Sequence, residues 1–150
     1  MGEQWQAMFL SLIALVIMLA GQTAEAPQPA TLTLACEGTT TLRYPNSGYP
    51  DERSPTSMGI IINFTTRTVQ GFGILGKGNR LPITAADDVT VTFYGYTSPR
   101  DPPAEAWIMG QINRVTGAVQ ATEFLDDNQN NKRLSVTIYE LKCRPTERML

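Results

Sequence analysis

The sequence predicts an all-β chain, an antiparallel up-and-down meander of about eight strands that closes into a small barrel. Apolar residues recur with period two throughout the chain after residue 26, and at helical spacing for no more than one turn. Short turn-forming stretches separate the alternating runs. The two cysteines, Cys36 and Cys143, lie in the first and last runs, so a disulfide between them would bring the ends of the sheet together.

The first 26 residues have the features of a signal peptide. Residues 8–20 form an apolar run of 13, the length of a signal-peptide core and short of the roughly 20 residues of a membrane-spanning helix. An Ala-x-Ala cleavage site follows at residues 24–26. The start of the chain lacks lysine and arginine, and Pro27 follows the site, so an uncleaved N-terminal anchor is the alternative. We expect residues 27–150 to form a single domain.

Removal of the signal peptide makes the domain electrically neutral. The 14 acidic residues lose Glu3 and Glu25 and become 12, equal to the 12 lysines and arginines. A neutral domain has no electrostatic attraction to nucleic acid and no polybasic cluster for anionic lipid. We therefore expect no nucleic-acid partner and no membrane association after processing.

The cysteines predict an oxidising compartment, because exported chains with an even number of cysteines usually pair them. Such a disulfide would close a loop of about 100 residues and stabilise the fold by about 3 to 5 kcal/mol. A lipoprotein acylated at Cys36 is the alternative, although this cysteine lies 16 residues beyond the apolar run. Signal peptide and disulfide together predict a secreted or periplasmic protein.

Eight alternating runs define the expected strands. Their approximate ranges are 31–37, 58–64, 67–73, 80–84, 88–96, 105–113, 117–125 and 132–143. Sequential strands joined by short turns usually pair, which gives a meander. The apolar phase of the last run changes after Ile138, so we expect a β-bulge near residues 138–140. Eight strands suit a small barrel, and a β-sandwich is the alternative.

Several turns carry specific signals. The segments INFTTRTVQ (residues 62–70) and INRVTGAVQ (residues 112–120) share five of nine residues. Their asparagine and threonine stand where a turn needs side chains that bond their own backbone, and Gly117 can adopt positive φ. We expect two tight hairpins of the same design, and a further turn at Asp87-Asp88.

The connections alternate between the two ends of a meander barrel, and all the longer ones fall at one end. These longer connections are residues 38–57, 74–79, 98–104 and 126–131. Loops held by a rigid scaffold commonly bind ligands, so this loop-rich end is the predicted functional face. Its candidate contact residues are Arg43, Tyr44, Tyr49, Arg53, Lys77, Arg80, Tyr96 and Arg100. Solvated connections without a partner are the alternative.

The stretch GFGILGKG, residues 71–78, has the glycine spacing of a dinucleotide-binding loop. Such a loop must leave a strand and open a helix, but the NRLPIT that follows favours another strand. We expect a flexible connection at the loop-rich end and no cofactor.

The chain has no histidine, which removes the usual base of serine and cysteine nucleophiles and the commonest metal ligand. The segment DDNQNN, residues 126–131, starts like a calcium loop but lacks the glycine at its sixth position. We expect a polar hairpin loop there, no metal site, and no enzymatic activity.

The segments SMGIIINFTTRTVQGFG, WIMGQINRVTG and YELKCRP resemble a group of small exported bacterial proteins of unknown function. The likeness covers most of residues 32–146 and implies export and a single domain. The expected architecture is similar to lipocalin-like and avidin-like barrels, but the lipocalin G-x-W signature is missing, so their ligands are not transferred.

Two functions are consistent with these features. The first is a non-enzymatic binding module, for a small apolar ligand inside the barrel or for an exported protein partner at the loop-rich end. The alternative is a proteinaceous inhibitor of an exported hydrolase, which would insert the proline-stiffened loop of residues 44–55. An interior cavity would favour the first function, and a filled interior with a protruding loop would favour the second.

Overall fold

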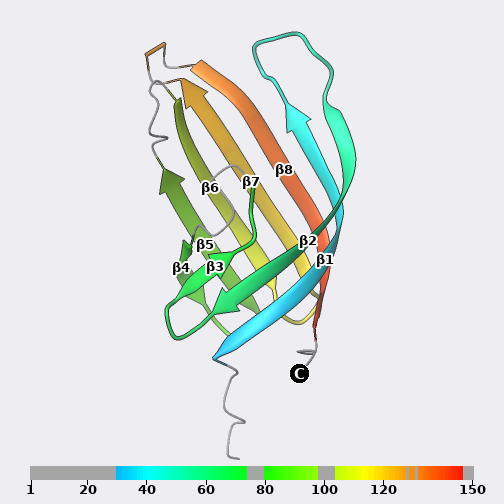
Figure 1. Ribbon diagram of the computed structural model, residues 1–150, viewed down its shortest axis with the longest axis vertical. Helices are drawn as coiled ribbons and strands as arrows, with labels where there is room; N and C mark the ends of the chain where they lie inside the picture. The colour runs from blue at the N-terminus through cyan, green and yellow to red at the C-terminus, as the bar shows by residue number, and fades with distance from the viewer. Residues whose placement is uncertain (1–29, 74–79, 98–103, 128, 131, 147–150) are drawn as a thin grey trace, which may run out of the picture.

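The computed structural model describes residues 30–73, 80–97, 104–127, 129–130 and 132–146. It confirms the all-β barrel: eight antiparallel strands pair in chain order and close on themselves (Figure 1). The strands are β1 (Thr31–Arg43), β2 (Glu52–Asn63), β3 (Thr68–Gln70), β4 (Leu81–Ala86), β5 (Thr90–Thr97), β6 (Ala104–Asn113), β7 (Ala118–Asp127) and β8 (Lys132–Pro145). No helix in these ranges is long and apolar enough to cross a membrane. The predicted signal peptide lies outside the described residues.

The first and last strands close the barrel. β1 and β8 are antiparallel neighbours, with Cys36 directly opposite Cys143. The two sulfur atoms form the predicted disulfide, across a sequence separation of 107. Because this bond closes a long loop in the unfolded chain, it contributes about 3 to 5 kcal/mol to stability. Such a bond is typical of proteins exported to an oxidising compartment.

β1 and β2 form a longer hairpin than the sequence predicted. The prediction of a loop over residues 38–57 is therefore wrong. The strands remain paired up to Leu42 opposite Glu52, so only residues 44–51 connect them. Threonines at 39–41 explain the extension, because β-branched side chains favour extended backbone even where no apolar alternation marks a strand. Figure 1 shows this hairpin reaching the loop-rich end of the barrel.

Inward-facing side chains from all eight strands form one apolar core. Its buried members are Leu34, Cys36, Ile60, Ile62, Val69, Phe72, Leu81, Ile83, Val91, Phe93, Ala106, Ile108, Ile112, Val119, Ala121, Tyr139, Leu141 and Cys143. The ring of Phe93 lies against the backbone of Gly110, where a Cβ atom would be 2.4 Å from the ring Cζ. The core therefore needs glycine at this inward position of β6.

β3 ends at Gln70, three residues before the predicted end of the strand. The backbone leaves the sheet at Gly71, which has a φ of 126°. A Cβ atom at this position would lie 2.2 Å from the carbonyl oxygen of Gly59. Both the positive φ and the close approach to β2 require glycine here.

Phe72 enters the barrel instead of continuing the strand. Its side chain is 5% exposed, and its ring centroid lies 5.0 Å from that of Phe93 and 5.4 Å from that of Tyr139. The start of GFGILGKG is thus part of the core, which corrects the prediction of a flexible surface connection. A strand, β4, follows this stretch, and residues 74–79 lie outside the described residues.

β8 contains a bulge, but not at the predicted position near residues 138–140. The pairing of β7 with β8 shifts between Leu125 and Asp126, which leaves Leu134 as the extra residue of β8. Leu134 is 41% exposed. From Ser135 the odd-numbered residues face inward, so Ile138 lies on the outer face and not in the core as its alternation suggested.

The two repeated segments form hairpin turns of the same design, as predicted. Asn63 and Asn113 each accept a hydrogen bond through Oδ1 from the backbone N–H three residues later, at 2.8 Å in both turns. The last turn residue has positive φ in both, 51° at Arg67 and 71° at Gly117. The first copy therefore places an arginine where the second has glycine.

The predicted turn at Asp87-Asp88 is also present. Oδ1 of Asp87 accepts the backbone N–H of Val89 at 2.8 Å and that of Thr90 at 2.7 Å. These bonds to the charged form hold the pKa of Asp87 below its usual value. Val89 lies in this turn and is 49% exposed, although the sequence predicted a strand over residues 88–96.

Candidate functional site

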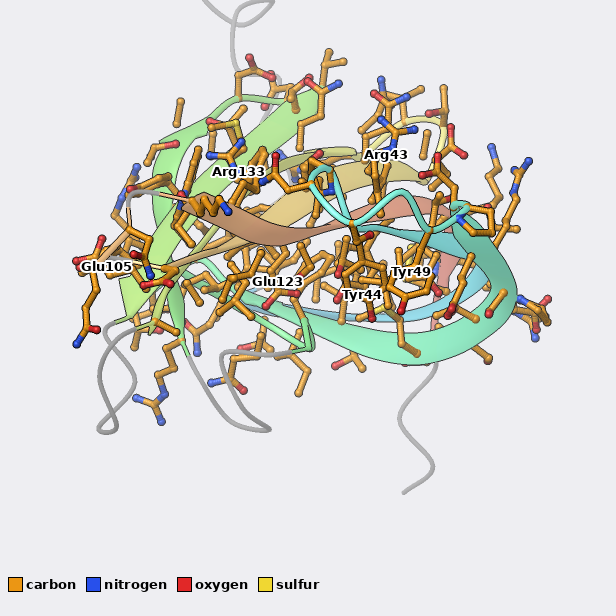
Figure 2. The ribbon with its side chains drawn as sticks, turned by 90° about the horizontal axis from the view of Figure 1, so that it is seen from above. Arg43, Tyr44, Tyr49, Glu105, Glu123 and Arg133 are labelled. Carbon is orange, nitrogen blue, oxygen red and sulfur yellow. A yellow bond between two sulfur atoms is a disulfide. The ribbon has the colours of Figure 1, made fainter. Side chains whose placement is uncertain are left out.

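Three of the predicted contact residues lie together at the tip of the β1–β2 hairpin. Nη2 of Arg43 donates to Oδ2 of Asp51 at 2.7 Å, which ties the two sides of the loop together. The hydrogen bond from Arg43 holds the pKa of Asp51 below its usual value. The rings of Tyr44 and Tyr49 meet edge to face at 6.4 Å, beside the barrel mouth (Figure 2). Tyr49 is 71% exposed.

The other predicted contact residues are dispersed. Arg53 lies on the outer face of the hairpin, 3.5 Å from the carboxylate of Glu140. Arg80 lies on the outer wall, in a small recess lined by residues of β2 and β3. Tyr96 lies on the outer face of β5 and is 53% exposed. Lys77 and Arg100 lie outside the described residues.

A buried carboxylate inside the barrel was not among the residues predicted from the sequence. Glu123 of β7 is 1% exposed and lies within the ring of strands when the barrel is viewed from above (Figure 2). The hydroxyl of Tyr139 donates to Oε2 of Glu123 at 2.9 Å. Burial raises the pKa of Tyr139, and the charge of Glu123 raises it further.

Gly73 is the third component of this interior polar cluster. A Cβ atom on Gly73 would lie 2.7 Å from the hydroxyl of Tyr139 and 3.6 Å from Oε2 of Glu123. Backbone of the inserted segment thus packs directly on the carboxylate–phenol pair. The cluster can hold the segment that begins with Phe72 in place by hydrogen bonding.

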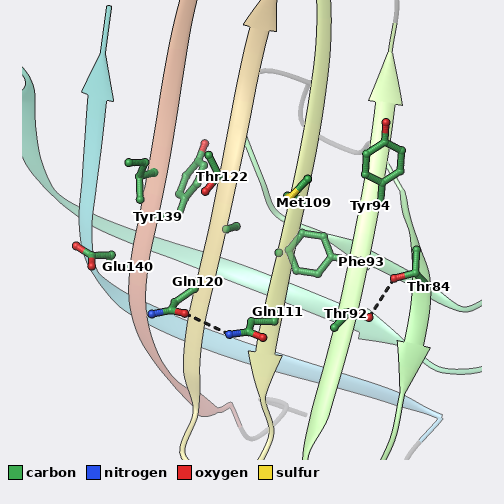
Figure 3. A pocket seen from close by; sticks show the side chains of 13 residues that line it. Thr84, Thr92, Phe93, Tyr94, Met109, Gln111, Gln120, Thr122, Tyr139 and Glu140 are labelled. Atoms are coloured by element: carbon green, nitrogen blue, oxygen red, sulfur yellow. Dashed lines mark hydrogen bonds between the residues drawn. The ribbon is translucent and has the colours of Figure 1, made fainter. Parts of the chain in front are cut away.

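The outer face of β4 to β8 carries an open groove of about 560 Å³ (Figure 3). Its outward-pointing lining residues are Thr84, Thr92, Tyr94, Met109, Gln111, Gln120, Thr122, Ile138 and Glu140. Tyr94 is 43% and Met109 46% exposed, which is unusual for large apolar side chains grouped on one face. This groove is the candidate binding site.

Strand register arranges the groove in rows that cross four neighbouring strands, β5 to β8. The first row is Tyr94, Met109, Thr122 and Ile138. The second row is Thr92, Gln111, Gln120 and Glu140. The groove therefore has a mainly apolar side and a polar side that run in parallel across the sheet.

A third row, nearer the loop-rich end, is aromatic. Trp107 and Phe124 stack with ring centroids 4.1 Å apart, and the guanidinium of Arg133 lies 4.3 Å from the Phe124 centroid. Asp126 accepts hydrogen bonds from Nε of Arg133 at 2.9 Å and Nε1 of Trp107 at 3.3 Å. The bond from Arg133 is the main cause that lowers the pKa of Asp126. Tyr94 connects this row to the groove, 6.5 Å from Trp107.

The groove is not at the predicted loop-rich end, and none of the predicted contact residues that the structure describes lines it. Two of them border it: Arg53 through Glu140, and Tyr96 two residues beyond Tyr94 on the same face of β5. Groups of histidine, cysteine or acidic side chains arranged to hold a metal ion do not occur in the part of the chain that the structure describes.

Comparisons with protein families, with characterised proteins and with solved structures find no match to this chain. The resemblance of three segments to small exported bacterial proteins therefore stays a prediction from the sequence.

Proposed function

We propose that the protein is an exported, non-enzymatic binding protein, secreted or periplasmic, that takes its ligand in the groove on the outer face of β4 to β8. The observation that carries this proposal is the pairing of Tyr94 and Met109, large apolar side chains that are both close to half exposed above a row of amides and hydroxyls. Ligand sites typically combine apolar walls with a few polar groups that fix orientation.

Export is supported by two independent features. The apolar run at residues 8–20 has the length of a signal-peptide core. The disulfide between Cys36 and Cys143 is typical of proteins in an oxidising compartment. A binding role without catalysis is supported by a chain that lacks histidine and has both cysteines in the disulfide.

The interior is a weaker candidate for an apolar ligand than the groove. Phe72 of the chain itself occupies the space between Phe93 and Tyr139, in ring contact with both. A ligand at this level would have to displace a side chain that is 5% exposed and already packed. The groove is open and needs no displacement.

Contact with an exported protein through the β1–β2 hairpin is a second candidate, and inhibition of a hydrolase is its most specific form. It is favoured by Tyr49, which is 71% exposed on a loop braced by the Arg43–Asp51 ion pair. A stiff loop with an exposed tyrosine loses little conformational entropy on binding.

Fragment screening by NMR tests the proposed site whatever the chemical identity of the ligand. Amide chemical shifts of the isotope-labelled, disulfide-bonded protein would be recorded with cocktails of small neutral fragments. We expect the shifts to concentrate at Tyr94, Met109, Gln111 and Gln120. Shifts concentrated at Tyr44 and Tyr49 would replace the groove with the hairpin, and shifts confined to Phe72, Phe93 and Tyr139 would replace it with the interior.

A further inference from the structure

We propose that the ligand of the outer groove is a neutral carbohydrate, a chain of sugar rings that lies across strands β5 to β8. This inference rests on the proposed function of the groove. It follows from the charge of the lining, from the two rows of side chains, and from the spacing of the strands (Figure 3).

The groove carries almost no net charge. Glu140 is the one charged residue among the described residues that line it, and its carboxylate lies 3.5 Å from Nη2 of Arg53. This exposed pair contributes little energy, but the guanidinium of Arg53 offsets the charge of Glu140. A phosphate, sulfate or carboxylate ligand would meet no cation among these lining residues. A neutral ligand suits this surface.

The polar row presents groups that suit hydroxyls. Gln111 and Gln120 lie opposite each other on β6 and β7, and Nε2 of Gln111 donates to Oε1 of Gln120 at 3.2 Å. An amide pair joined by one bond still offers donors on the second amide and an acceptor on the first. Adjacent hydroxyls of a sugar, each both donor and acceptor, can bond to both members of such a pair.

The apolar row suits the C–H face of a sugar ring. Tyr94 and Met109 are directly opposite each other on β5 and β6, and Ile138 continues the row on β8. The face of an aromatic ring carries negative charge density and attracts weakly positive C–H groups. A pyranose ring has one such apolar face and a rim of hydroxyls, so it can satisfy both rows at once.

Strand spacing matches the repeat of an extended sugar chain. Neighbouring strands lie about 4.8 Å apart, a spacing comparable to the length of one sugar ring with its linkage in an extended oligosaccharide. One ring per strand would place about four rings across β5 to β8. A peptide that binds by strand addition is less suited, because β6 and β7, in the middle of the groove, are each paired on both sides.

The test uses neutral oligosaccharides of increasing length, from one to six rings, in the cello-, xylo-, manno-, malto- and laminari- series. Trp107 is the only tryptophan left after removal of residues 1–26, and it lies 6.5 Å from Tyr94. Its fluorescence and isothermal titration calorimetry report binding. We expect at least one series to bind, with affinity rising up to about four rings and then levelling, because four strands form the site.

Variants locate the binding. Tyr94→Ala and Gln120→Ala should each weaken binding by about tenfold or more, whereas Tyr94→Phe, which keeps the ring, should weaken it by less than about threefold. Tyr49→Ala removes a more exposed tyrosine at the hairpin and is the control, with unchanged affinity expected. Near-ultraviolet circular dichroism and the midpoint of thermal unfolding confirm that each variant is folded.

Three results would overturn the inference. The first is no binding by any neutral series at millimolar concentration. The second is binding that Tyr49→Ala weakens and Tyr94→Ala leaves unchanged. The third is preferential binding of the anionic polygalacturonate series. If fragments perturb the groove residues while no sugar binds, the carbohydrate inference fails and the proposed binding function stands. If neither fragments nor sugars perturb the groove residues, both the inference and the proposed function fail.

Discussion

The hydroxyl of Tyr139 donates a hydrogen bond to the carboxylate of Glu123 inside the barrel, at an O–O distance of 2.9 Å. Glu123 is 1% and Tyr139 6% exposed, and Gly73 packs against both. Loss of either partner removes this hydrogen bond from a polar side chain that stays buried, which costs more than the bond itself contributes. This pair joins the inserted segment to the wall of the barrel.

Glu123→Leu and Tyr139→Phe should therefore each lower the free energy of unfolding by about 1 to 3 kcal/mol. The double variant should cost less than the sum of the two, because the hydrogen bond between the two side chains is lost only once. Urea unfolding of the four proteins measures both quantities. Glu140→Gln, on the outer face, is the matched control with little change expected. Strict additivity would show that the two side chains do not interact.

The pKa of Tyr139 is raised, chiefly by burial and then by the charge of Glu123, from a value of 10.0 in the unfolded chain. Because the pKa is raised in the folded state, the contribution of Tyr139 to stability is complete below about pH 10. This contribution declines as pH rises further, because the unfolded chain releases the proton first. We expect Tyr139→Phe to flatten the loss of stability above pH 10. Tyrosinate absorbance should also show one tyrosine that ionises only on unfolding. An equally steep alkaline limb in the variant would contradict this assignment.

Asp126 should make a contribution to the free energy of unfolding that is lost in acid. Its pKa is held below 3.8 by the hydrogen bond from Arg133 foremost, so its stabilisation is present above about pH 3.8 and is lost as pH falls through the lower folded value. The side chain is partly exposed, so the effect should stay below about 1 kcal/mol. Because Trp107 also donates to Asp126, its fluorescence should change over the same acid range. Asp126→Asn should remove that change, and its persistence would assign the titration to another group.

The two related turns allow a matched backbone test. Arg67 has a φ of 51° and Gly117 a φ of 71°. Arg67→Gly should raise stability by about 0.5 to 1 kcal/mol, because a residue with a Cβ is strained in this region. Gly117→Ala should be destabilising, since its Cβ would also lie 2.1 Å from the carbonyl oxygen of Cys143. Thermal unfolding of both variants gives the comparison. A destabilised Arg67→Gly would mean that the arginine side chain contributes more than the strain costs.

The strands and their closure could be predicted because both depend on local pattern and on one long-range constraint. Period-two alternation marks Val91 and Phe93, or Leu141 and Cys143, as inward, and the two cysteines imply that the first and last strands meet. The extension of β1 could not be found in this way. The threonines at 39–41 favour a strand through their branched side chains and show no apolar alternation.

Glu123 could have been found from the same alternation. Val119 and Ala121 face inward, and continuing the period by two residues places Glu123 inward as well. Phe72 and the groove lacked such a signal. Phe72 continues an alternating run, and only the approach of Gly71 to Gly59 shows that the backbone leaves the sheet. The groove depends on register across four strands, which sequence periodicity within one strand does not contain.

The central claim is that the outer face of the barrel, and not its interior or its hairpin, binds the ligand. A crystal structure of the mature, disulfide-bonded protein soaked with the fragments or sugars that give the strongest NMR or fluorescence response tests it most directly. We expect bound molecules along the rows that begin at Tyr94 and Thr92. Bound molecules in the place of Phe72 inside the barrel, or against Tyr44 and Tyr49 with the groove empty, would contradict the claim.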